Sequence, residues 1–163
     1  ATMLPAADLP ERAFYKPRKR HRAEKILNYL DQVMPADRCD IIVGITDVDI
    51  STTKGRVKDW GILGMGMIRG TAGVVSSFRM TRKVDRATQK RRMISTVNHE
   101  IGHVLGAPHG GAPGCLMNDA KGTVRTVDKE HGLLCRESRK LIETHTGRRL
   151  PHLERFDWEQ FLD

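Results

Sequence analysis

Apolar residues recur at steps of three and four in two segments, which is the spacing of one face of an α-helix. In the segment over 20–34, which Pro35 ends, the apolar positions are Ala23, Ile26, Leu27, Leu30, Val33 and Met34. In the segment over 86–105, which Gly106 can stop, they are Met93, Ile94, Val97, Ile101, Val104 and Leu105. The sequence therefore predicts two amphipathic helices.

Three apolar runs between these helices predict strands. Residues 40–46 are rich in β-branched side chains, as in a buried strand. Residues 60–68 form a glycine-rich run, and residues 73–78 form a third run. A turn over Gly70–Gly73 would make the last two strands antiparallel neighbours.

The two ends of the chain are less regular. Residues 1–17 carry three prolines and are predicted to be an extended lead-in. Residues 107–127 are predicted to be a loop rich in glycine and proline. Asp128 suits the N-cap of a last helix that ends near His145.

This order of elements predicts an α/β fold in which helices pack on a sheet. We expect one domain over residues 1–163, divided into an N-terminal subdomain, 1–106, and a C-terminal subdomain, 107–163, with a cleft between them. A chain of 163 residues that is 39% hydrophobic and 29% charged can bury a core of this kind. We expect it to be a monomer.

The charge pattern leaves one partner class to consider. The net charge is +8, and the densest basic runs are Lys16–Arg22 and Lys90–Arg92, which would suit a basic nucleic-acid-binding module. Only 5% of the residues are aromatic, so few are available to stack on bases. Nucleic acid is therefore not the expected partner.

No targeting or membrane segment is expected. No apolar run approaches the roughly 20 residues that a bilayer-spanning helix needs. The first residues contain no basic segment followed by an apolar one, so they do not predict a signal peptide.

The second predicted helix carries the clearest chemical pattern. His99 and His103 are four residues apart, so their imidazoles lie on one face of the helix. Glu100 lies one position round, close enough to take a proton from zinc-activated water. Gly106 lets the chain turn back, so that His109 can supply a third nitrogen. Three ligands leave a fourth position open, as in catalytic zinc sites; the alternative is a surface helix that happens to carry histidines.

The complete motif, His99-Glu100-x-x-His103-x-x-Gly106-x-x-His109 with a later Met117, resembles the metzincin signature. The similarity is greatest to one branch, the archaemetzincins. Cys115-Leu-Met117 matches that branch's C-x-M motif, and Cys135 falls at the spacing of a later cysteine. Further similarity lies at Arg20–Ala23, Thr46–Ile50 and Val74–Arg79, so the resemblance covers most of residues 15–142.

The resemblance implies a zinc-dependent metallopeptidase of endopeptidase or aminopeptidase type, acting on a peptide or protein. It implies a twisted mixed β-sheet, a backing helix, an active-site helix and a Met-turn followed by one helix. His99, His103 and His109 would bind Zn²⁺, Glu100 would be the general base, and Met117 would form a packing floor. Asp119 stands where some metzincins have a tyrosine ligand, so no tyrosine switch is expected.

The glycine-rich strand is expected to form the upper edge of the cleft, where an extended peptide can add as a strand. The candidate substrate contacts are Gly64, Met65, Gly66 and Met67. The glycines at 61, 64 and 66 would allow close approach of the backbone, or they merely mark a bulge.

Three aspartates are expected to have structural roles. Asp47 and Asp49 are expected to cap the strand end or to pair with Arg20 or Arg22, and not to act as a catalytic pair. Asp119 is expected to hydrogen-bond within its own loop.

The archaemetzincin resemblance also implies a second zinc site made of four cysteines, and here the chain departs from it. The matching positions are Gly110, Cys115, Cys135 and Ser138. A closed structural site needs about four N or S ligands, so we expect one catalytic ion and no second zinc.

The two remaining cysteines of that site, Cys115 and Cys135, are hypothesised to form a disulfide. The alternative is a pair of buried thiols. A disulfide favours an extracytoplasmic location, periplasmic or secreted, over the cytoplasm. Cys39 is expected to be buried before the first strand.

Two other function classes remain open beside the peptidase: a zinc-binding protein with little turnover that recognises peptides, and the basic nucleic-acid-binding module. The intact Glu100 favours the peptidase, because binding alone needs the metal ligands but no general base.

Overall fold

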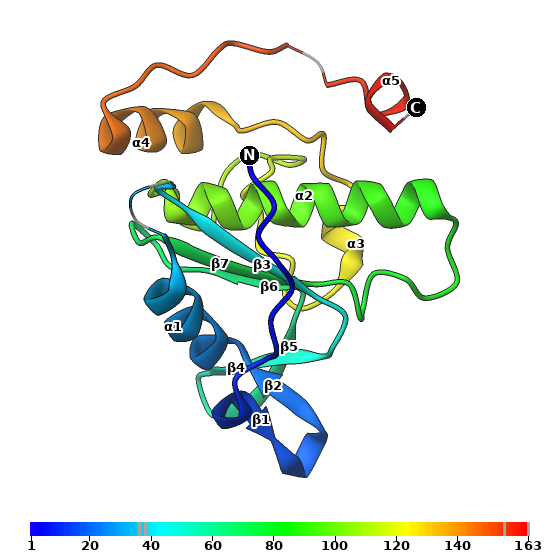
Figure 1. Ribbon diagram of the computed structural model, residues 1–163. Helices are drawn as coiled ribbons and strands as arrows, with labels where there is room; N and C mark the ends of the chain where they lie inside the picture. The colour runs from blue at the N-terminus through cyan, green and yellow to red at the C-terminus, as the bar shows by residue number, and fades with distance from the viewer. Residues whose placement is uncertain (36, 38, 155, 163) are drawn as a thin grey trace.

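The computed structural model describes residues 1–35, 37, 39–154 and 156–162. A three-stranded sheet of order β3-β7-β6 lies between helix α1 (Ala23–Val33) and helix α2 (Arg86–Val104) (Figure 1). Strands β3 (Ile42–Thr46) and β7 (Ala72–Ser76) run parallel, and β6 (Gly64–Gly66) runs antiparallel to β7. The predicted α/β fold, with a mixed sheet, a backing helix and an active-site helix, is confirmed.

Strand β7 shows why the two helices cover opposite faces of this sheet. Val74 packs in a cluster with Ile26 and Leu30 of α1, whereas Val75 belongs to a second cluster with Met93 and other residues of α2. Successive side chains of a strand point to opposite faces. The continuous apolar run at 72–75 is therefore that of a strand buried on both sides.

A second sheet has the order β1-β2-β4-β5, formed by β1 (Phe14–Tyr15), β2 (Arg20–Arg22), β4 (Ile50–Lys54) and β5 (Val57–Ile62). The single strand predicted over 60–68 is therefore two strands, β5 and β6, which Leu63 separates. The prediction of β6 and β7 as antiparallel neighbours is confirmed.

The N-terminal boundaries differ from those predicted. The helix predicted from residue 20 begins at Ala23, because Arg20–Arg22 is taken up by β2, where His21 pairs with Ile50 of β4. The lead-in over 1–17 was predicted to be extended but contains two 3-10 turns and β1.

The C-terminal part also differs. Helix α2 agrees with the prediction, but the loop after it contains a short helix, α3 (Val124–Val127). The last predicted helix begins at Arg136 (α4, Arg136–Thr146) and not after Asp128, whose carboxylate binds Arg92 instead. A further short helix, α5 (Trp158–Leu162), contacts α2.

None of the helices in the described part of the chain combines the length and the apolar character that crossing a membrane requires.

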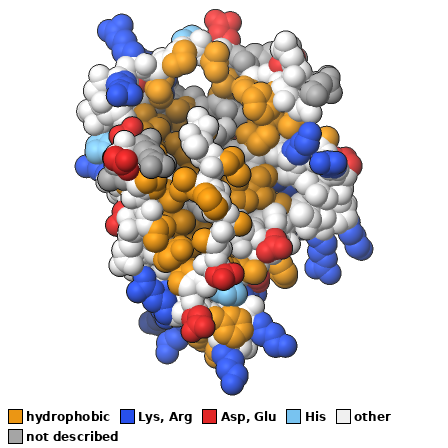
Figure 2. All heavy atoms as spheres, viewed as in Figure 1, with side chains coloured by type: hydrophobic (Ala, Val, Ile, Leu, Met, Phe, Trp, Pro, Cys, Tyr) orange, Lys and Arg blue, Asp and Glu red, His pale blue; other side chains and the backbone are white. Residues whose placement is uncertain are grey.

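Arginines of both basic runs are used inside the fold. Arg20 pairs with Asp49 and Asp59, and the buried Arg92 pairs with Asp128. Other Lys and Arg side chains gather at the lower end of the face in Figure 2, where Figure 1 places β1 and β2. Part of the charge that suggested a nucleic-acid surface, that of Arg20 and Arg92, is therefore paired within the domain.

Candidate metal centre and active-site cleft

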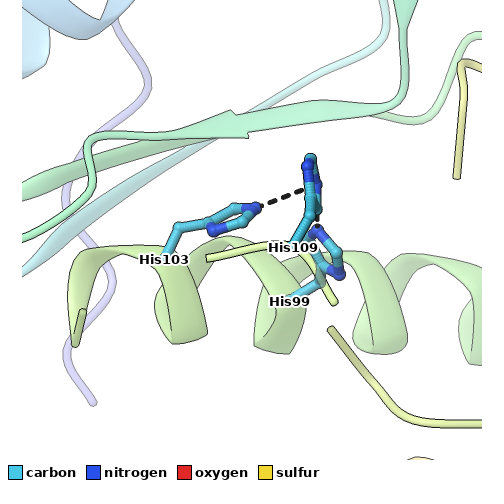
Figure 3. Close-up of side chains that lie close together, drawn as sticks. All are labelled: His99, His103 and His109. Atoms are coloured by element: carbon cyan, nitrogen blue, oxygen red, sulfur yellow. Dashed lines mark hydrogen bonds between the residues drawn. The ribbon is translucent and has the colours of Figure 1, made fainter. Parts of the chain in front are cut away.

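The three histidines of the motif converge on one point. His99 and His103 rise from the same side of α2, and His109 reaches them from the loop that follows (Figure 3). The Nε2 atom of His109 lies 3.1 Å from Nε2 of His99 and 3.1 Å from Nε2 of His103. Nitrogen ligands of a tetrahedral zinc ion are about 3.3 Å apart. The arrangement therefore fits a zinc site and not a surface helix with unrelated histidines.

Hydrogen bonds of the other ring nitrogens orient two of these ligands. Nδ1 of His99 lies 2.6 Å from the carbonyl oxygen of Leu116, and Nδ1 of His103 lies 2.7 Å from that of Ala107. A carbonyl only accepts, so each Nδ1 carries the proton and each Nε2 presents a lone pair. These two lone pairs converge on Nε2 of His109, which is the arrangement that a shared metal ion needs.

Burial also keeps the histidines neutral. It lowers the pKa of His99 to about 4 and lowers the pKa of His103 and of His109. Neutral imidazole is the form that binds a metal. The ligand set is therefore ready at neutral pH, with no proton to be displaced from Nε2 of His99 or His103.

Gly106 brings the third ligand back toward the helix. Its φ of 103° is in the region that favours glycine, and its N–H donates to the carbonyl of His103. Ala107 then donates to the carbonyl of Gly102. This turn ends α2 and redirects the chain toward His109.

Glu100 is buried between α2 and β6. A Cβ atom on Gly64 would lie 2.5 Å from Oε1 of Glu100, and one on Gly66 would lie 2.5 Å from the carbonyl oxygen of Glu100. These glycines therefore serve close approach of β6 to the active-site helix, and not only a bulge. Burial raises the pKa of Glu100 to about 8, while a hydrogen bond from the backbone of Gly66 opposes the rise.

Met117 lies directly against the metal-binding helix. It is fully buried, and a Cβ on Gly102 would lie 2.4 Å from its sulfur. The carbonyl of the preceding Leu116 binds His99. The Met-turn thus orients His99 through the carbonyl of Leu116, and Met117 packs against the turn of α2 that carries His103.

A cleft of about 340 Å³ opens at the histidines. Gly64, Met65 and Gly66 form part of its wall, as predicted, but Met67 does not and packs with the core beside α1. The sequence did not point to Lys54, Thr96 or Glu130, which also line the cleft. Lys54 lies on β4 and Glu130 in the loop after α3, so no local pattern connects these two to the motif, whereas Thr96 lies on α2 one turn before Glu100.

Asp49 has the structural role expected of it. Asp49 accepts hydrogen bonds from Arg20 and Arg79, each at 2.7 Å, whereas Arg22 binds Glu24. Asp47 is exposed.

Asp119 lines the cleft beside the histidines. It accepts a bond of 2.7 Å from the backbone of Lys121, within its own loop as expected, and pairs with Lys54 at 3.1 Å. The cluster of potential metal ligands found among the described residues is His99, His103 and His109.

The hypothesised disulfide is not formed in the structure. Cys115 and Cys135 lie together as predicted, but both are free thiols. The hydroxyl of Ser138 lies 3.8 Å from the sulfur of Cys115 and 3.2 Å from that of Cys135. The N–H of Cys135 donates to the sulfur of Cys115. Both sulfurs are thiols within reach of the Ser138 hydroxyl, and the extracytoplasmic location stays a prediction. Cys39 is half-buried and also free.

A Cβ on Gly111, and not on Gly110, would meet both sulfurs, at 2.5 Å from Cys135 and 2.9 Å from Cys115. The glycine that closes over the thiol pair is therefore one residue later than the position matched from the sequence.

Comparisons with known proteins agree with this geometry. The profile of peptidase family M54 matches residues 2–144. Archaemetzincin of Saccharolobus solfataricus is 29% identical over 140 residues, covering 83% of this chain and 72% of its own. Archaemetzincin of Archaeoglobus fulgidus is 30% identical over 135 residues, covering 83% of this chain and 76% of its own.

Structural similarity points the same way. The crystal structure of archaemetzincin from Methanopyrus kandleri superimposes with a TM-score of 0.76 at 26% identity, covering 87% of this chain and 74% of that one. The chain therefore belongs to peptidase family M54 and is an archaemetzincin-like zinc metallopeptidase.

Proposed function

We propose that this chain hydrolyses peptide bonds at a single zinc ion held by His99, His103 and His109, with Glu100 as the general base. The observation that carries the proposal is the convergence of three imidazoles, with Nε2 of His109 3.1 Å from Nε2 of His99 and of His103, beside the buried carboxylate of Glu100. Zinc, when bound, would polarise the scissile carbonyl and make water acidic enough to lose a proton near neutral pH.

Glu100 is placed to move that proton. Its carboxylate faces the cleft, and the wall of β6 covers it from the other side. In this position it accepts a proton from the attacking water and delivers it to the leaving amine. Zinc binding alone needs the three imidazoles and no carboxylate beside them, and the buried carboxylate of Glu100 is costly to keep. The buried position thus favours turnover over binding without turnover.

Strand β6 offers the substrate a backbone surface. It is the edge strand of its sheet, so the side away from β7 is open to pairing. An extended peptide that adds to β6 would lie along the cleft wall formed by Gly64, Met65 and Gly66. Glycines on this wall leave the backbone groups accessible, so main-chain hydrogen bonds would position the scissile bond.

We also infer one zinc per chain. At the positions matched to the four-cysteine site, the thiols of Cys115 and Cys135 lie within hydrogen-bond distance of the Ser138 hydroxyl. The backbone of Gly111 approaches both sulfurs closely. Two thiols and a hydroxyl are a poor donor set for a closed structural zinc site.

A peptide-library experiment tests the proposed reaction. Zinc-loaded protein is incubated with randomised decapeptides, with free and with acetylated N termini, and new termini are identified by mass spectrometry. We expect cleavage by the wild type, and we expect Glu100→Gln to retain its zinc but to lose about 10²- to 10⁴-fold in kcat/KM. Cleavage by Glu100→Gln at the wild-type rate would contradict the assignment of the base.

A further inference from the structure

The cleft continues beyond the histidines into a buried recess. Four residues line this part, each at most 4% exposed: Leu63, Thr96, Val127 and Glu130. Thr96 lies one turn before Glu100 on α2, so it shares the same helix face. The recess therefore begins next to the general base and lies where a side chain adjacent to the scissile bond would enter.

Glu130 brings an unpartnered carboxylate into this recess. Its Oε2 atom is inaccessible to solvent and has no hydrogen-bond partner. The backbone of the same residue is satisfied, since its N–H donates to Val127 and its carbonyl accepts from Arg91. A buried carboxylate without a partner destabilises a fold by several kcal/mol when it is ionised. Oε2 of Glu130 is thus a hydrogen-bond acceptor to which no group of the described residues donates.

Neither Arg91 nor Arg92 donates to the Glu130 carboxylate, although the buried Nε of Arg91 also has no hydrogen-bond partner. Arg91 donates to the carbonyls of Asp128 and Glu130, and its guanidinium lies 5.6 Å from the ring of Trp158. Arg91 lines a second cavity and not the cleft, whereas Glu130 lines both. Arg92 is held by the carboxylate of Asp128. Burial raises the pKa of Glu130 to about 7, and the charge of Arg91 only partly offsets this.

We propose that Glu130 is a specificity residue that receives the cationic end of a substrate lysine or arginine entering this recess. The apolar walls, Leu63 and Val127, suit the methylene stem of such a side chain. The charged end would meet the carboxylate in a site shielded from water, where a charge-assisted hydrogen bond is strong. A neutral side chain would leave the carboxylate unpaired. This inference rests on the proposed peptidase function.

Matched substrates test it. The library experiment first locates the preferred residue beside the scissile bond; three peptides then carry lysine, norleucine or glutamate at that position. At pH 8 we expect the wild type to prefer lysine to norleucine by about 10- to 100-fold in kcat/KM. Glu130→Gln should abolish this ratio. Glu137→Gln, which removes an exposed carboxylate on α4, should keep the ratio.

The ratio of two substrates within one variant does not depend on the folded fraction, so a merely structural role of Glu130 would leave it unchanged. A wild type without preference for lysine or arginine beside the scissile bond, or Glu130→Gln with the preference intact, would overturn the inference.

If no peptide is cleaved, the proposed function fails, and fluorescence anisotropy on zinc-loaded protein, with decapeptides that carry lysine or norleucine at the same central position, decides the inference. Tighter binding of the lysine peptide that disappears in Glu130→Gln would support it, and equal binding of the lysine and norleucine peptides would overturn it.

Discussion

Gly64 offers a direct way to move the catalytic carboxylate without touching the metal. A Cβ at this position would lie 2.5 Å from Oε1, 2.8 Å from Cγ and 2.9 Å from Cδ of Glu100. The backbone of Gly64 does not have the positive φ that excludes alanine, so Gly64→Ala fits β6 locally. The whole effect of the substitution should therefore fall on the side chain of Glu100.

The size of the displacement follows from these distances. An ordinary contact of a Cβ begins near 3.4 Å, so the carboxylate must retreat by about 1 Å. A misplacement of about 1 Å at a reacting group can cost about 100-fold in rate, or about 2.7 kcal/mol in the activation barrier. We expect Gly64→Ala to lose about this much in kcat, with its zinc content unchanged.

Gly73→Ala is the matched control, since its Cβ would lie 3.5 Å from the Cβ of Glu100, an ordinary contact. Peptide cleavage, zinc content and thermal unfolding are measured for both variants and for the wild type. Full activity in Gly64→Ala, or an equal loss in Gly73→Ala, would refute the idea that β6 sets the position of Glu100.

Three further predictions concern the surroundings of the site. Folding raises the pKa of Glu130 from 4.5 to about 7, so ionisation of this carboxyl lowers the free energy of unfolding as pH rises through this range, by at most about 3 kcal/mol. In urea unfolding, Glu130→Gln should therefore be more stable than the wild type at pH 8 and no more stable at pH 4. Equal stability of the two proteins at pH 8 would contradict this. Gly102→Ala should lower the free energy of unfolding by about 1–3 kcal/mol, because its methyl group would meet the sulfur of Met117 at 2.4 Å. The double variant Gly102→Ala, Met117→Ala should lose less stability than the sum of the two single losses. Additive losses would exclude the contact. Protein prepared without reductant should show three reactive thiols per unfolded chain in a colorimetric thiol assay; one thiol would mean that Cys115 and Cys135 form the disulfide after all.

The parts of this account that the sequence predicted are those with a local signal. His99, Glu100 and His103 lie within two turns of one helix, and Gly106 marks where that helix ends, so their geometry follows from helix periodicity. Strand β7 was predictable for a similar reason, because the buried residues 72–75 leave a continuous apolar run.

Other parts depend on contacts between distant segments. Arg20–Arg22 continues the apolar pattern of α1 poorly and pairs with β4, a strand whose polar sequence gave no periodic signal. Asp128 has the chemistry of an N-cap, but an ion pair with Arg92, 36 residues away, takes its carboxylate. Glu130 became a candidate only when folding placed it in the wall of the same cleft as Thr96.

Zinc content tests the central claim most directly. Elemental analysis after dialysis is made on the wild type, on His109→Ala and on His152→Ala, which removes an exposed histidine away from the cluster. The three-histidine site predicts about one zinc per chain in the wild type and in His152→Ala, and almost none in His109→Ala. A folded wild type without zinc, or full zinc retained by His109→Ala, would contradict it.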